Sequence, residues 1–150
     1  MIGTEIDWIR QSSQDFVEEL LASYQLDLFV GSVHHVHTLP IDYTFDLFQR
    51  ALEQSGGSSE QLYEDYFDAQ YAMLQALKPP IVGHFDLIRL KSDAPNASFK
   101  VYPRVWMKIV RNIKYVIGYG GVVEINSAAL RKGLEEPFPS IDICKVCDLQ

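Results

Sequence analysis

Short apolar runs alternate along this chain with longer segments in which apolar residues recur at helical spacing. The apolar runs predict strands at residues 1–6, 26–33, 81–86 and 122–126. The segments between them predict helices at residues 12–24, 45–52, 59–77 and 104–117, and Pro137 predicts the start of a last helix. Strands separated by helices in this way are typical of βα units around a parallel sheet. The pattern therefore predicts an α/β protein, and no linker divides it.

Two motifs that suggest chemistry have simpler explanations. The glycine-rich stretch from Gly118 to Gly121 stands between a predicted helix and a predicted strand, whereas a phosphate-binding loop follows a strand and opens a helix. Cys144 and Cys147 form a C-x-x-C, but no second Cys or His pair lies nearby to complete a zinc site. We interpret the glycines as a helix end and the cysteines as two ordinary thiols on the terminal helix.

The composition excludes several classes of protein. With 150 residues, 47% of them hydrophobic and 22% charged, the chain is long enough for one domain with a buried core. A formal net charge of −7 argues against a nucleic-acid partner, because such proteins present a basic surface to the phosphates. No run reaches the roughly 18 apolar residues of a membrane span, and no secretory leader is visible. We therefore expect no membrane partner and a cytoplasmic location.

Candidate metal ligands fall within or just after the predicted strands. Glu5 lies in the first strand, His34 follows the second, and His84 lies in the third. Parallel strands bring their carboxyl ends to one side, and imidazole and carboxylate are ordinary ligands of catalytic zinc, iron and manganese. We expect Glu5, His34 and His84 to lie around a metal centre. A hydrogen-bonded histidine at a strand end is the alternative for each imidazole.

Two further histidines and two arginines extend the candidate set. Strand alternation places His35 and His37 on the opposite face from His34, and no role is predicted for them. Arg89 and Arg131 each follow a predicted strand by a few residues, and a guanidinium suits a phosphate group. We expect both arginines to contact an anionic substrate, with a solvated surface arginine as the alternative for each.

Several segments of the sequence occur together, in the same order, in one known family. They are Gly31-Ser32-Val33-His34-His35-Val36, Leu39-Pro40-Ile41-Asp42, Tyr66-Phe67-Asp68-Ala69-Gln70-Tyr71, Gly83-His84-Phe85-Asp86-Leu87-Ile88-Arg89, Glu124-Ile125-Asn126 and Leu130-Arg131-Lys132-Gly133. With them, residues 2–145 resemble the monofunctional histidinol-phosphatases of the polymerase and histidinol phosphatase (PHP) superfamily, particularly the fungal type. The resemblance implies a distorted, TIM-like barrel of about seven βα units, of which this chain would form a part.

The resemblance also implies an activity and a site. Family members are hydrolases of phosphoric monoesters that convert L-histidinol phosphate to L-histidinol and phosphate in L-histidine biosynthesis. They use divalent metal ions (Zn, Mn or Fe), up to three in the complete site. Glu5 resembles the bridging carboxylate, His34 and His84 resemble imidazole ligands, and Arg89 and Arg131 resemble candidates for holding the phosphate. No catalytic residue is identified beyond the metal ligands.

The chain departs from the family at two motifs. Members begin with a strand carrying His-x-His and place an Asp-x-His near their C-terminus, and this chain has neither at the matching place. We interpret it as a fragment of a single PHP-type domain or a truncated gene model, with a degenerate paralogue as the alternative. The open sheet edges of a partial barrel predict a marginally stable chain or a homo-oligomer. The alternative functions are a non-catalytic remnant that binds metal weakly or binds a partner, and a PHP phosphoesterase with another substrate.

Overall fold

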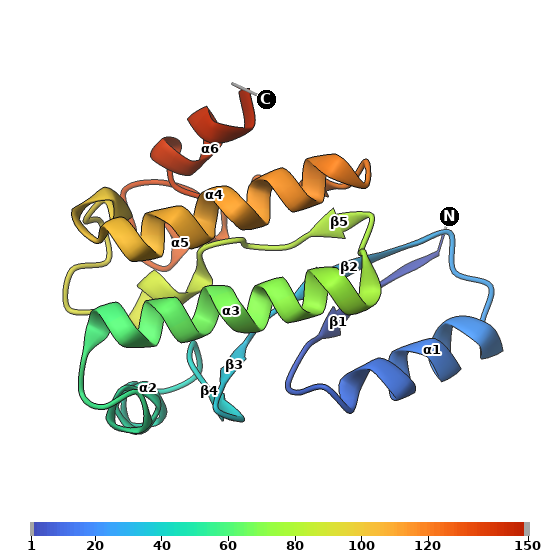
Figure 1. The fold of residues 1–150 in the computed structure, drawn as a ribbon, viewed down its shortest axis with the longest axis horizontal. Helices are drawn as coiled ribbons and strands as arrows, with labels where there is room; N and C mark the ends of the chain where they lie inside the picture. The colour runs from blue at the N-terminus through green and yellow to red at the C-terminus, as the bar shows by residue number, and fades with distance from the viewer. Residues whose placement is uncertain (1, 149–150) are drawn as a thin grey trace.

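The computed structural model describes residues 2–148, which form a parallel sheet with helices packed along it (Figure 1). The strands are β1 (Gly3–Asp7), β2 (Leu28–Ser32), β3 (His35–Val36), β4 (Leu39–Pro40), β5 (Ile81–Val82) and β6 (Val122–Val123). The helices are α1 (Ser13–Ser23), α2 (Phe45–Gln54), α3 (Ser59–Leu77), α4 (Pro103–Gly118), α5 (Ala128–Arg131) and α6 (Ile141–Asp148), with 3-10 turns η1 (Leu87–Lys91) and η2 (Phe99–Val101). The four-stranded sheet has the order β1-β2-β5-β6 and is parallel throughout, whereas β3 and β4 form a separate antiparallel hairpin. The predicted α/β class with a parallel sheet is confirmed.

β5 and β6 are each two residues long, shorter than the strands predicted at residues 81–86 and 122–126. The predicted last helix is present, but it begins at Ile141 rather than at Pro137. β5 ends at Val82 because the backbone of His84 is left-handed, with φ of 24°, and turns the chain out of the sheet. Phe138 exchanges backbone hydrogen bonds of 3.0 and 2.7 Å with Asn126, just beyond β6. This bridge occupies the backbone that a helix would need, and α6 begins only at Ile141.

The sheet presents different side chains on its two faces, because successive residues of a strand point to opposite sides. Ile6 and Phe29 are buried on one face, where they pack against Val17 of α1. Glu5 and Asp7 flank Ile6 in β1 and point to the other face. The packing of α1 therefore directs two carboxylates toward the side of the sheet that carries the candidate site.

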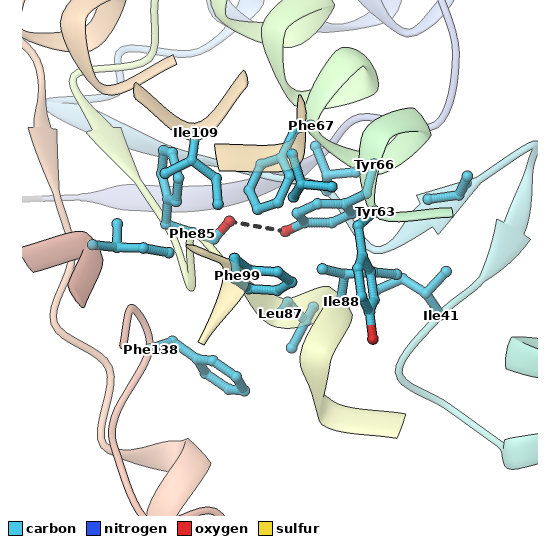
Figure 2. Close-up of a cluster of buried hydrophobic side chains, with 14 of the residues drawn as sticks. Ile41, Tyr63, Tyr66, Phe67, Phe85, Leu87, Ile88, Phe99, Ile109 and Phe138 are labelled. Atoms are coloured by element: carbon cyan, nitrogen blue, oxygen red, sulfur yellow. Dashed lines mark hydrogen bonds between the residues drawn. The ribbon is translucent and has the colours of Figure 1, made fainter. Parts of the chain in front are cut away.

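The main hydrophobic core lies between α3, α4 and the segment that follows β5 (Figure 2). Tyr66, Phe67 and Phe85 are fully buried there. The hydroxyl of Tyr66 donates a 3.2 Å hydrogen bond to the backbone carbonyl of Phe85, which Figure 2 shows as a dashed line, and the Gln70 amide donates another of 2.8 Å. Because Phe85 directly follows His84, the core side of α3 fixes the backbone beside a candidate ligand.

Neither edge of the four-stranded sheet is covered by another strand within residues 2–148. β1 pairs only with β2, and β6 pairs only with β5 in this part of the chain. The barrel expected from the family resemblance therefore stays a prediction. Across the same residues, no helix combines the length and apolar character needed to cross a membrane.

The core predicts a clear difference between two phenylalanines. Phe67→Ala is expected to lower the free energy of unfolding by about 3–5 kcal/mol, because it leaves a cavity in place of a fully buried ring. Phe16→Ala is the matched control, since the ring of Phe16 is 66% exposed, and it is expected to change stability by about 0.5 kcal/mol or less. Urea unfolding followed by circular dichroism measures both. Equal losses would contradict this assignment of the core.

Candidate metal centre

Glu5, His34 and His84 come together at one end of the parallel sheet. Their donor atoms all lie within 4.8 Å of one another. Oε1 of Glu5 is 3.2 Å from Nε2 of His34 and 2.9 Å from Nε2 of His84. The two imidazole rings meet edge to face, with their centroids 4.7 Å apart. One carboxylate oxygen and two imidazole nitrogens therefore face a common point.

The backbone at His84 has a positive φ, and the neighbouring residues stabilise this conformation. A Cβ atom at Gly83 would lie 2.8 Å from both Oγ of Ser32 and Cγ1 of Val30, so only glycine fits against β2. The left-handed φ of 24° at His84 is costly for a residue with a side chain. Oε2 of Glu124, the residue that follows β6, accepts the backbone N–H of His84 at 3.1 Å and holds this conformation.

Two aspartates hold His34 from other directions. Oδ1 of Asp7 accepts the backbone N–H of His34 at 3.1 Å, and Oδ2 of Asp42 lies 3.2 Å from the ring atom Nδ1. Neither aspartate was among the predicted ligands. The available signals were the place of Asp7 two residues after Glu5, on the same face of β1, and the place of Asp42 in a family segment.

The two imidazoles have opposite electrostatic environments. Burial works against protonation of His34, but hydrogen bonds to Asp42 and Glu5 outweigh it and raise the pKa of His34 to about 9. Burial and the charge on His34 lower the pKa of His84. Partial burial works to raise the pKa of Glu5, but its interactions with Ser32 and with the two histidines lower this pKa overall. At neutral pH the centre therefore holds a carboxylate, an imidazolium and a neutral imidazole.

This donor set fits a divalent cation. Two imidazole nitrogens and a carboxylate oxygen are ligands of catalytic zinc and of iron or manganese sites. Three protein ligands also leave coordination positions for water or a substrate. Among residues 2–148, one group of three or more His, Cys, Asp or Glu side chains is close enough together to hold a metal ion, and it consists of Glu5, His34 and His84.

The other two histidines lie outside this centre. Nδ1 of His35 is 2.8 Å from Oδ2 of Asp7. His37 stands at the turn of the β3–β4 hairpin, with φ of 52°, and its Nε2 is 2.9 Å from Asp65 and 3.0 Å from Ser55. The hairpin therefore directs His35 and His37 to partners other than Glu5, whereas His34 precedes it and faces Glu5.

Arg89 is placed in the interior of the protein. Its side chain is 3% exposed, and Nε lies 3.0 Å from the buried carboxylate of Asp86. Its guanidinium donates further hydrogen bonds of 3.1 Å to the carbonyl of Pro95 and 3.0 Å to that of Glu136. This placement supports a structural role in joining two loops, and contact with a substrate phosphate stays an untested prediction for Arg89.

Arg131 and its neighbour Lys132 are both exposed at the end of α5. Burial works to raise the pKa of Asp42, but the hydrogen bond to His34 and the charge of Lys132 lower it. The positive charge of Lys132 therefore acts on a residue that contacts His34. Lys132 is a second candidate cation for a phosphate group, and the sequence signal for it was its place beside Arg131.

The fold and the site define an α/β protein with a candidate metal centre at one end of its parallel sheet. The chain belongs to the PHP domain family, whose pattern matches residues 1–128. It is 48% identical over 141 residues to the probable histidinol-phosphatase of Schizosaccharomyces pombe, covering 93% of this chain and 46% of that protein. It is 34% identical over 168 residues to the histidinol-phosphatase of Saccharomyces cerevisiae, covering 97% of this chain and 50% of that protein. The chain thus spans about half the length of the curated relatives it matches.

The raised pKa of His34 predicts how the stability of the metal-free protein depends on pH. The folded-state pKa is about 9 and the unfolded value is 6.5, so the folded state binds the additional proton between these values. The stabilisation is complete below pH 6.5 and is lost as the pH rises through about 9. Urea unfolding of chelator-treated protein across this range should show a falling free energy of unfolding.

His34→Gln is expected to remove most of that pH dependence. His37→Gln is the matched control, because the imidazole of His37 contacts Asp65 and Ser55 rather than Glu5, and this variant should retain the dependence. If His34→Gln and the wild type show the same decline between pH 6.5 and about 9, the electrostatic description of His34 is wrong.

Proposed function

We propose that this chain is part of a metal-dependent phosphatase that hydrolyses L-histidinol phosphate to L-histidinol and phosphate, a step of L-histidine biosynthesis. The observation that carries this proposal is the meeting of Glu5, His34 and His84 at one end of a parallel sheet. The names of the two relatives from Schizosaccharomyces pombe and Saccharomyces cerevisiae support the choice of substrate. The negative charge of the chain agrees with a small-molecule partner rather than a nucleic acid.

The proposal includes a finer architecture. We expect the four-stranded sheet to belong to a distorted, TIM-like barrel of about seven βα units within a single PHP-type domain. The edges of β1 and β6 that are unpaired within residues 2–148 are where further strands would add. Up to three metal ions in a complete site, assembly into a homo-oligomer and a cytoplasmic location stay predictions that accompany this proposal.

In the proposed site, Glu5, His34 and His84 would hold a divalent ion. A bound divalent ion would supply Lewis acidity and an activated water at neutral pH. Arg131 and Lys132 would bind the anionic oxygens of the phosphate and stabilise the charge that they carry during transfer. No side-chain nucleophile is required.

Metal loading is expected to produce phosphatase activity. The chain reconstituted with Zn²⁺, Mn²⁺ or Fe²⁺ should release phosphate from L-histidinol phosphate, and a chelator should abolish this release. Glu5→Gln and His84→Ala should weaken metal binding by more than the roughly 10- to 100-fold that loss of an outer-shell partner typically costs. Isothermal titration calorimetry measures the binding, and a colorimetric phosphate assay measures the activity.

His37→Gln is the matched control for these variants and should retain both metal affinity and activity. A wild-type chain that binds metal but releases no phosphate from L-histidinol phosphate would contradict activity of this chain on that substrate. A panel of other phosphate monoesters would then distinguish a phosphoesterase with another substrate from a module that only binds metal.

Arg131 is expected to contribute to substrate binding. Arg131→Ala should raise KM for the phosphate ester by about 10- to 100-fold, because hydrogen bonds to charged groups are worth about 1.5–3 kcal/mol. Arg50→Ala removes an exposed arginine from α2 and should leave KM unchanged. Steady-state kinetics of the metal-loaded protein test the difference. An unchanged KM in Arg131→Ala would exclude Arg131 from phosphate binding.

A further inference from the structure

The β3–β4 hairpin brings together two residues that are eight positions apart in the sequence. His34 immediately precedes the hairpin, and Asp42 follows it after one residue. The hairpin pairs His35 with Pro40, and the backbone N–H of Ile41 donates to the carbonyl of His34 at 2.9 Å. These bonds set the path of the chain, and Oδ2 of Asp42 comes to lie 3.2 Å from Nδ1 of His34.

Asp42 contacts His34 on the side of the ring that does not face Glu5. Nδ1 of His34 points to Asp42, and Nε2 points to Glu5 at 3.2 Å. The two ring nitrogens diverge, so the contacting oxygens lie on opposite sides of the imidazole. Asp42 also lies outside the group of converging donor atoms that Glu5 forms with the two histidines. Asp42 is therefore placed to act on His34 rather than to share its ligand position.

The two imidazoles of the centre differ in whether a carboxylate contacts Nδ1 of the ring. Nδ1 of His84 is buried and has no hydrogen-bond partner among the residues that the structure describes. The ring of His84 is held instead through its backbone, by Glu124 at the amide nitrogen and by the left-handed turn after Gly83. His34 immediately precedes the β3–β4 hairpin, and its ring has a carboxylate partner of its own.

We propose that Asp42 is a positioning residue for His34, which fixes the imidazole with a proton on Nδ1 and directs Nε2 to the metal position. This inference rests on the metal centre of the proposed function and extends it to a residue to which no role has been assigned. A carboxylate that accepts the free N–H of a ligating histidine fixes the tautomer and makes the other nitrogen a stronger donor. The Asp42–His34 contact therefore increases metal affinity without adding a ligand.

Two substitutions at Asp42 separate the hydrogen bond from the charge. Asp42→Ala removes the acceptor and is expected to weaken binding of Zn²⁺ or Co²⁺ by about 10- to 100-fold. Asp42→Asn keeps an amide oxygen that accepts from Nδ1–H but carries no charge, so it should restore part of the lost affinity. Glu53→Gln removes an exposed carboxylate from nearby α2 and should leave affinity unchanged.

The affinities are measured by calorimetry with the metal alone, and the Co²⁺ visible spectrum reports the ligand geometry. Urea unfolding of the metal-free variants shows whether a substitution also lowers the stability of the whole fold. If Asp42 acts only by positioning His34, Asp42→Asn need not lower that stability. Wild-type affinity in both Asp42 variants would overturn the positioning role while leaving the metal centre intact. A wild-type chain that binds neither Zn²⁺ nor Co²⁺ would overturn the metal centre, and with it the role of Asp42. The order wild type, Asn, Ala in decreasing affinity would support the proposal.

Discussion

The parallel register of β1 against β2 is the constraint on which the candidate metal centre depends. It pairs Glu5 with Val30 and places Ile6 on the opposite face, where Ile6 and Phe29 pack against α1. A slip by one residue would exchange these faces, burying Glu5 against α1 and exposing Ile6. Since full burial of such an apolar side chain is worth about 1.5–3 kcal/mol, apolar packing on one face keeps a carboxylate in place on the other.

The second histidine depends on a different part of the molecule. His84 has a left-handed backbone, which costs free energy and persists only where the surroundings determine it. Those surroundings are the close approach of Gly83 to β2, the carboxylate of Glu124, and the two hydrogen bonds that α3 donates to the carbonyl of Phe85. The buried face of α3 thus serves both the stability of the core and the placement of a ligand.

Sequence reasoning was most effective where periodicity and strand order determine position. The helix at residues 59–77 and the grouping of Glu5, His34 and His84 follow from a regular apolar pattern and from the common direction of parallel strands. It was least effective where contacts join distant segments. The strands of the β3–β4 hairpin are two residues long, too short to show a pattern, and the burial of Arg89 depends on carbonyls at residues 95 and 136. Spacing along the chain carries no information about such contacts.

The charges around His34 explain why this centre should favour a cation. Glu5 and Asp42 lie on either side of one imidazole, and together they overcome its burial and favour its protonated form. The proton on Nδ1 is held by Asp42 and does not lie in the way of an ion, whereas the proton on Nε2 occupies the position that an ion would take. A divalent cation at that position would replace a single positive charge with two, and the carboxylate of Glu5 would be available to bind it. The electrostatic field that stabilises the imidazolium in the metal-free protein is thus the field that a divalent ion would use, with His84 available as a neutral second donor.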